Sequence, residues 1–199
     1  MSTDASTLDT VDTRIGARIR NLRAEQGLTL DALATEADVS RAMLSRIERG
    51  ESSGTAQLLA KVCNGLGITL AALFVEPAAS SPLARHADQP TWRDPASGYL
   101  RRTVSPSGTR SLVDVTEIEF PPGATVQFDN TRSIGTEQHV WVLDGTLELA
   151  LGERTVRLNR GDCFWMPLDD STRFHNSSPH PVRYAVVLAR RSRAPWMPS

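Results

Sequence analysis

The spacing of apolar residues changes once along this 199-residue chain, and that change constrains the fold more than any other feature. From about Thr13 to Phe74 the apolar residues recur at helical spacing, and Ile15, Ile19 and Leu22 form one stripe. From Trp92 onward, short β-rich runs such as TLELAL and VRYAVVL are separated by turn sequences such as PPG, LGE and NRGD. The sequence therefore predicts an all-α domain followed by an all-β barrel or sandwich.

Hydroxyl residues and glycines divide the first domain into five short helices. A Thr or Ser precedes each of the last four helices, where its side chain accepts a hydrogen bond from a backbone N–H of the first turn. A glycine follows the first, third and fourth helices, as is common where a left-handed residue ends a helix. The predicted N-caps are Thr29, Ser40, Thr55 and Thr69, and the predicted stops are Gly27, Gly50 and Gly67.

Two of these helices form a closely spaced pair within LTLDALATEADVSRAMLSRIERG. A short helix, a tight turn at residues 37–39 and a second helix capped by Ser40 give the layout of a helix-turn-helix. The second helix has an apolar face that is predicted to pack inward, formed by Val39, Leu44 and Ile47. Its polar face is predicted to point outward and consists of Arg41, Ala42, Ser45, Arg46 and Arg49.

The stretch from Arg14 to Phe74 resembles the XRE family, the helix-turn-helix domains related to phage repressors. The motifs that carry the resemblance are GLTL, Leu33-Ala34, Val39-Ser40, Leu44-Ser45, IERG and LLAKVCNGLGI. The resemblance implies a lambda-repressor-like domain of five helices that binds double-stranded DNA, with the second helix of the pair in the major groove.

The same resemblance implies roles for individual residues. An arginine at a base-facing position grips guanine through two hydrogen bonds, whereas contacts to the DNA backbone set the register. The predicted base-facing residues are Arg41, Ala42, Ser45 and Arg46. The predicted backbone-contacting residues are Thr29, Ser40, Ser52 and Thr55. Glu48 matches a glutamate that pairs with an arginine of the first helix, here Arg23, so its implied role is structural.

Two positions depart from the family pattern. Asp38 stands in the turn where glycine is frequent, and aspartate tolerates a left-handed backbone better than most residues. Gly54 stands where proline is common. An alternative interpretation is a helical bundle whose arginines are only solvated, because eight basic against six acidic residues between positions 14 and 75 are a small excess. The capped helix pair and its turn favour DNA binding.

Composition argues against two other classes of protein. No apolar run approaches the ~20 residues that span a bilayer, and the polar N-terminus MSTDASTLDTVDTR does not resemble a secretion signal. Cys63 and Cys163 lie far apart and belong to no Cys-x-x-Cys pair, which predicts two reduced thiols rather than a redox switch. We therefore expect a cytoplasmic protein with no membrane partner.

From about Ser111 to Leu188 the chain resembles a cupin, a small double-stranded β-helix or jelly-roll barrel. PPG at residues 121–123 and VLDG at residues 142–145 resemble the two ends of the first cupin motif. Gly161-Asp162 and Pro167 resemble the second motif. The resemblance implies an interior in which metal-binding members hold an ion with histidines and a carboxylate.

The metal-ligand positions of the barrel hold the wrong residue types. The glutamate position is Gln138, the second-motif histidine position is Thr172, and the paired-histidine positions fall in Asn130–Ser133, which contains no histidine. An amide and a hydroxyl are poor ligands for a divalent cation. His139 and His175 differ from these positions by odd offsets, which predicts side chains on the other face of the sheet. We expect no metal, no cofactor and no catalytic residue.

A metal-free barrel of this size can still hold one small molecule. Gln138 and Thr172 are predicted as polar contacts, and strand alternation predicts Val140 and Phe174 as walls. Tyr184 is a further candidate. The alternative is that these residues only fill the barrel core.

Together these observations predict two domains with flanking segments. The predicted parts are a disordered tail at 1–12, an XRE helix-turn-helix domain at 13–76, a linker with entry strands at 77–110, a cupin sensor and dimerisation domain at 111–190 and a tail at 191–199. We expect a homodimeric, sequence-specific transcriptional regulator with a palindromic DNA operator and an unidentified small-molecule effector. The alternatives are a metal-dependent cupin enzyme tethered to DNA and a repressor whose cupin only dimerises. Amino acids, sulfur compounds and polyamines are all conceivable effectors.

Overall fold

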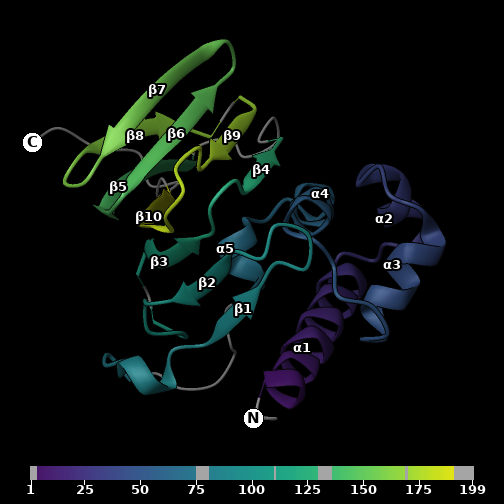
Figure 1. The fold of residues 1–199 in the computed structure, drawn as a ribbon. Coiled ribbons are helices and arrows are strands. Elements are labelled where there is room, and N and C mark those ends of the chain that lie inside the picture. Colours follow the sequence, from purple (N-terminus) through teal and green to yellow (C-terminus); the bar gives the residue numbers. More distant parts are fainter. Residues whose placement is uncertain (1–3, 75–80, 110, 130–135, 169, 191–199) are drawn as a thin grey trace, which may run out of the picture.

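The computed structural model describes residues 4–74, 81–109, 111–129, 136–168 and 170–190, without the side chains of residues 4–10 and 190. Five α-helices come first and ten strands follow (Figure 1). The helices are α1 Asp4–Glu25, α2 Leu30–Glu36, α3 Arg41–Glu48, α4 Ala56–Leu66 and α5 Leu70–Leu73. A short 3-10 helix, His86–Asp88, precedes the strands. None of the described helices is long and apolar enough to cross a bilayer.

The first helix is longer than the sequence analysis predicted. Helix α1 begins at Asp4, so the expectation of a disordered tail over residues 1–12 is wrong from Asp4 onward. Val11 extends the buried stripe of Ile15 and Ile19 by one turn. Gly16 lies where α1 crosses α3, because a Cβ atom there would sit 2.1 Å from the carbonyl oxygen of Ile47. The absent side chain thus permits the close approach of the two helices.

The predicted caps position the remaining helices. Thr29, Ser40, Thr55 and Thr69 each accept a hydrogen bond from a backbone N–H in the first turn of the helix that follows. Gly67 has a φ of 67° and ends α4 in the left-handed conformation. These four caps and the glycine stop confirm the helix boundaries that the sequence predicted.

The strands form two antiparallel sheets that enclose the barrel core. The six-stranded sheet has the order β1-β2-β3-β10-β5-β8, and the four-stranded sheet has the order β4-β9-β6-β7. The strands of the larger sheet are β1 Thr91–Arg93, β2 Leu100–Thr103, β3 Val113–Phe120, β5 Thr136–Asp144, β8 Cys163–Pro167 and β10 Val182–Arg190. Those of the smaller sheet are β4 Thr125–Phe128, β6 Thr146–Leu151, β7 Arg154–Asn159 and β9 Thr172–His175.

One continuous hydrophobic core joins the helical and the β halves. Figure 1 shows α4 and α5 beside strands β1 to β4. A polar contact crosses the same junction: the buried carboxylate of Asp94 accepts a hydrogen bond of 2.8 Å from the backbone N–H of Ala56, the first residue of α4. Asp94 also accepts from the N–H and the hydroxyl of Ser97, at 2.8 and 2.5 Å. The entry strands therefore hold the start of α4 directly.

Candidate functional sites

Helix α3 presents two chemically distinct faces. Leu44 and Ile47 are buried in the core, and Val39 packs against it just before the helix. Arg41, Ala42 and Arg46 are exposed and Ser45 is half-buried, so the four predicted base-facing residues share the outer side of one short helix. The spacing of the apolar residues, together with the Ser40 cap, is what turns this side outward.

The two predicted base-reading arginines differ in their present partners. Arg41 forms an ion pair of 2.8 Å with Asp31 of α2, and both side chains are exposed. Within the described residues, Arg46 has no ion-pair partner. Exposed pairs of this kind contribute little to stability, so the Arg41 guanidinium is readily available to another anion.

Next to this face, Arg49 is held by two neighbours. Its Nε and Nη2 atoms donate to the carboxylate of Glu51 at 2.6 and 2.7 Å, and Nη1 donates to the hydroxyl of Ser45. The Arg49 hydrogen bond holds the pKa of Glu51 below its ordinary value. Arg46 also acts electrostatically on Glu51, but no described carboxylate forms an ion pair with it.

The predicted backbone-contacting residues lie around the ends of these helices. The hydroxyls of Thr29, Ser40 and Thr55 cap α2, α3 and α4, with N···O distances of 3.1, 3.2 and 3.2 Å. Ser52 is half-buried in the loop between α3 and α4. The exposed starts of α2 and α3 orient backbone N–H groups in the way that suits phosphate oxygens.

Two structural predictions about this domain are confirmed. The guanidinium of Arg23 forms a two-pronged hydrogen bond with the carboxylate of Glu48, at 2.7 and 2.8 Å, and the side chain of Glu48 is buried. This hydrogen bond raises the pKa of Arg23. Asp38 has a φ of 51°, the left-handed conformation expected at this turn. Gly54 is buried against Leu59, whose side chain would lie within 2.8 Å of an added Cβ atom.

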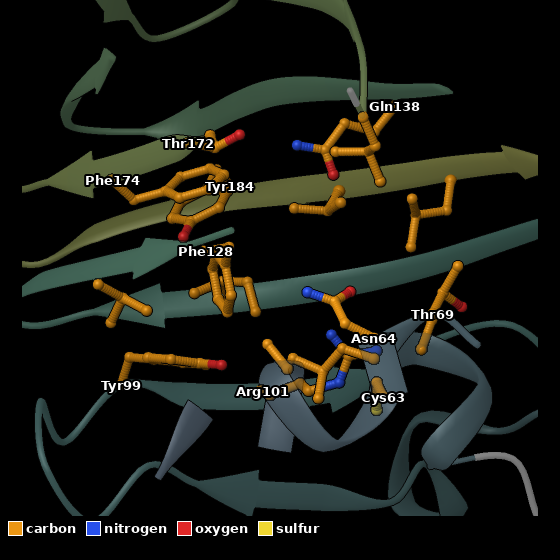
Figure 2. Close-up of a pocket in the computed structure, with 18 of the residues that line it drawn as sticks. Cys63, Asn64, Thr69, Tyr99, Arg101, Phe128, Gln138, Thr172, Phe174 and Tyr184 are labelled. Atoms are coloured by element: carbon orange, nitrogen blue, oxygen red, sulfur yellow. The ribbon is translucent and has the colours of Figure 1, made fainter. Parts of the chain in front are cut away.

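A second candidate site is a cavity of about 100 Å³ inside the barrel. Figure 2 shows Gln138 and Thr172 on one side of it and Tyr99, Arg101 and Cys63 on the other. Apolar and aromatic side chains line the space between them. These residues include Ile118, Phe120, Val126, Phe128, Leu168, Phe174, Tyr184, Val186 and Leu188.

Three of the four predicted barrel residues line this cavity. Gln138, Thr172 and Phe174 do so, as does the further candidate Tyr184, whose ring stacks on Phe174 with centroids 5.8 Å apart. Val140 is fully buried but is not part of the lining. The cupin resemblance pointed to Gln138 and Thr172 and strand alternation to Phe174, whereas which inward residue borders the empty space depends on packing.

Sequence reasoning missed the other side of the cavity. Arg101 of β2 lies in the region predicted as a linker with entry strands, yet its side chain is buried and faces the barrel interior. The helical domain also contributes to the wall, through the end of α4 and the start of α5. The lining residues from this domain are Ala60, Cys63, Asn64, Ile68, Thr69, Leu70 and Ala71. No local pattern could show that the helical domain packs against the barrel at this point.

Burial controls the chemistry of the ionisable groups around the cavity. Removal from water raises the pKa of the Cys63 thiol to about 12 and raises the pKa of Tyr184 well above its ordinary value. The same desolvation lowers the pKa of Arg101, although nearby Tyr99 and Asp114 act against it. Neutral forms are thus favoured for the thiol and the phenol.

The described residues contain no group of three or more histidine, cysteine, aspartate or glutamate side chains that could hold a metal ion. Asn130–Ser133, the predicted place of the paired ligands, lies outside the described residues. His139 and His175 alternate with buried neighbours and do not line the cavity. His175 instead contacts the hydroxyl of Thr125, 2.8 Å from its Nδ1 atom.

A row of aromatic side chains connects the helical domain to the cavity. Each ring lies within 5.5 to 6.1 Å, centroid to centroid, of the next. The row runs in the order Phe74, Trp92, Tyr99, Phe120, Tyr184 and Phe174. The rings pack in tilted or edge-to-face contacts, apart from the stacked pair of Tyr184 and Phe174.

Comparison with known proteins agrees with this architecture. Residues 19–73 match a helix-turn-helix family model, and residues 116–188 match a cupin domain model. The chain is 25% identical over 174 residues to the HTH-type transcriptional regulator SutR of Escherichia coli, covering 87% of this chain and 93% of that protein. It is 34% identical over 62 residues to the transcriptional regulator ClgR of Mycobacterium tuberculosis, covering 31% of this chain and 55% of ClgR.

Among solved structures, an HTH_3 family transcriptional regulator from Vibrio cholerae has the same fold. It superposes with a TM-score of 0.75 at 24% identity, over 92% of this chain and 99% of that one. The chain therefore consists of an XRE-type helix-turn-helix domain followed by a cupin domain.

Proposed function

We propose that this protein is a sequence-specific DNA-binding transcriptional regulator that acts as a homodimer and senses a small molecule in its barrel. The observation that carries the DNA-binding role is the outer face of α3, where Arg41, Ala42 and Arg46 stand exposed on a helix capped by Ser40. Such a helix fits the major groove, with arginines reading guanine. The similarity to the Escherichia coli transcriptional regulator supports the same role.

The homodimer is supported by an exposed apolar face of the larger sheet. Trp141 and Trp165 are 49% and 52% exposed on neighbouring strands β5 and β8, and Val113 on β3 is 40% exposed. Strand β8 is the edge of its sheet, so its outer side has no strand partner among the described residues. A second copy of the chain would cover both the tryptophans and this edge. Two-fold symmetry would then present two α3 helices to a palindromic operator.

The sensing role is supported by the composition of the cavity wall. Its lining includes no aspartate, glutamate or histidine among the described residues, so the barrel has groups for binding rather than for acid–base chemistry. Residues of α4 and α5 form part of the same wall. A ligand there would contact both domains, and a ligand that prefers one domain arrangement shifts the population toward it.

Selection of DNA fragments tests the DNA-binding role. Fragmented genomic DNA is passed over the immobilised protein at two salt concentrations, and the retained fragments are sequenced. We expect a few palindromic sites to persist at the higher salt, because base contacts survive the screening that removes non-specific phosphate binding. Uniform retention that disappears with salt would contradict base reading by α3.

Sedimentation equilibrium tests the dimer. We expect the wild-type chain to be a dimer and Trp165→Lys to shift it toward the monomer, because a charge would be buried in the interface. Leu83→Lys is the matched control, since Leu83 is equally exposed but lies outside the sheet face. A monomeric wild type, or a Trp165→Lys chain that stays dimeric, would contradict this interface.

A further inference from the structure

Arg101 is a buried cation with no carboxylate at ion-pair distance among the described residues. Its side chain is 6% exposed, and its Nη2 atom donates to the hydroxyl of Thr116 at 2.8 Å. Its guanidinium carbon lies 4.9 Å from the ring centre of Phe74, and its Nε atom has no hydrogen-bond partner among the described residues. Asp114 acts on it electrostatically, but no described carboxylate lies within ion-pair distance. Burying a charge in this way is costly unless something else compensates it.

The neighbouring arginine shows that the sheet does not require this arrangement. Arg102 is the next residue of β2, and its side chain is half-exposed on the opposite face, with Nη1 3.4 Å from the backbone oxygen of His86. Lys and Arg are almost never fully buried unless they are paired. The buried position of Arg101 therefore calls for a compensating partner inside the barrel.

Other polar side chains border the same space. Gln138, Tyr99 and Tyr184 are buried and line the cavity. Among the described residues of the cavity wall, the Nε atom of Arg101 is the buried side-chain polar atom without a hydrogen-bond partner. Buried polar groups in folded proteins are nearly always hydrogen-bonded, so this atom marks a place for a bound polar group. In Figure 2, Arg101 and Gln138 stand on opposite sides of this space.

We propose that the effector is a small organic monoanion, whose carboxylate binds Arg101 and whose uncharged body lies against the aromatic wall toward Gln138. This inference rests on the proposed sensing role and specifies its ligand. The cavity of about 100 Å³ is smaller than the ~150 Å³ cavity that accommodates benzene, so the body has few heavy atoms. Because no described acidic side chain lines the cavity, polyamines and other cations have no counter-charge there.

The location of this site explains how a bound anion would affect the DNA-binding domain. Arg101 stacks over Phe74 at the end of the helical domain, and Asn64 and Cys63 of α4 form the wall beside it. Asn64 also donates to the backbone oxygen of Asp129, at 2.5 Å, just after β4. An anion on Arg101 thus adds a charge interaction to a junction that already joins α4 to the barrel.

Three small probes that share an isopropyl group and differ in charge test the proposal. Isobutyrate, isobutyramide and isobutylamine are titrated into the full chain at constant ionic strength, and the melting temperature is recorded, because binding to the native state raises it. We expect a saturable increase with isobutyrate and none with the amide or the amine. In the wild type, intermolecular NOEs from the isobutyrate methyl groups to Phe174 and Leu188 should place the probe in the cavity.

The matched variants are Arg101→Gln and Arg102→Gln, whose folding is checked by circular dichroism. Loss of a charge-assisted hydrogen bond should weaken isobutyrate binding at least about tenfold in Arg101→Gln and leave it unchanged in Arg102→Gln. Equal binding of the three probes, NOEs to other residues or no binding at all would overturn the proposal. Cavity NOEs from isobutylamine alone would overturn the anion class but keep the sensing role, and DNA retention is measured separately from both.

Discussion

The outer face of α3 and the barrel cavity both depend on arginine, but they place it in opposite environments. Arg41 and Arg46 are exposed, and they hold their charge at no cost because water solvates it. Arg101 is buried, with one weakly polar partner and an aromatic ring. Exposed arginines are free to meet a large polyanion such as DNA, whereas a buried arginine needs a compensating partner, which is the Glu48 carboxylate for Arg23 and is proposed to be a bound anion for Arg101. Burial rather than residue type therefore separates the proposed DNA-reading arginines of α3 from the proposed anion-binding arginine of the cavity.

The largest expected effect is the difference in alkylation rate between the buried Cys63 thiol and the exposed Cys163 thiol. Cys63 lines the cavity with a pKa raised from 9.0 to about 12, whereas Cys163 is exposed on the edge strand β8. At pH 8, this shift alone should make alkylation of Cys63 by iodoacetamide at least about a thousandfold slower than that of an unshifted thiol. Mass spectrometry after timed quenching measures both rates, and Cys163→Ser isolates the slow one.

The raised pKa of Cys63 also predicts how the free energy of unfolding depends on pH. A raised folded-state pKa means that the folded protein keeps its thiol proton after the unfolded chain has lost it. The contribution of Cys63 is therefore complete below pH 9 and is lost as the pH rises toward 12. Urea unfolding of wild type and Cys63→Ala between pH 7.5 and 9.5 measures it. Similar alkylation rates for Cys63 and Cys163 would contradict the burial of Cys63.

The Arg23–Glu48 pair tests burial within the DNA-binding domain. Glu48→Gln leaves the largely buried Arg23 without its carboxylate, so we expect a loss of ~3 kcal/mol in the free energy of unfolding. Glu51→Gln breaks the exposed pair with Arg49 and should leave stability unchanged. Urea unfolding of both variants measures the difference. Equal losses of unfolding free energy in Glu48→Gln and Glu51→Gln would show that pairing rather than burial determines the contribution of an ion pair.

Arg46→Ala tests the exposed side of the comparison. Removing a base-reading arginine should weaken binding to a retained operator by about 5- to 150-fold and leave the melting temperature unchanged. Arg20→Ala is the control, because Arg20 is exposed on α1, away from the predicted base-facing set. Fluorescence anisotropy with labelled operator measures both. A loss of the same size in Arg20→Ala would indicate general charge attraction instead of base reading.

Asp94→Asn tests the junction between the two halves and has the smallest expected effect. The charged acceptor at the start of α4 becomes neutral, so we expect a loss of about 1 kcal/mol in unfolding free energy. Asp88→Asn in the exposed 3-10 helix is the matched control. Hydrogen exchange of the α4 amides should increase in the first variant only. Unchanged exchange would mean that Asp94 does not hold α4.

The α3 face was predictable because local rules determine it. The hydroxyl caps, the apolar spacing and the turn at Asp38 act over a few residues, and each of them matches the structure. Inside the barrel, the cupin motif positions pointed to Gln138 and Thr172 and strand alternation pointed to Phe174, and all three line the cavity. These residues lie on regular strands, where alternation fixes the direction of a side chain.

The missed features depend on contacts between distant segments. Leu100–Thr103 contains two adjacent arginines, and alternation alone does not tell which of them turns inward. The share of α4 and α5 in the cavity wall follows from the packing of two domains, which has no sequence pattern. Residues 4–12 are polar apart from Ala5, Leu8 and Val11, so their helical structure could not be predicted from an apolar stripe.

The central claim is that α3 reads a DNA sequence, and a specificity ratio tests it most directly. The affinity of the wild-type chain is measured for a retained operator fragment and for a shuffled fragment of the same length and composition, at physiological salt. We expect the operator fragment to bind at least ~10³-fold more tightly than the shuffled fragment. Arg46→Ala should reduce this ratio of affinities. Equal affinities for the two fragments would contradict it.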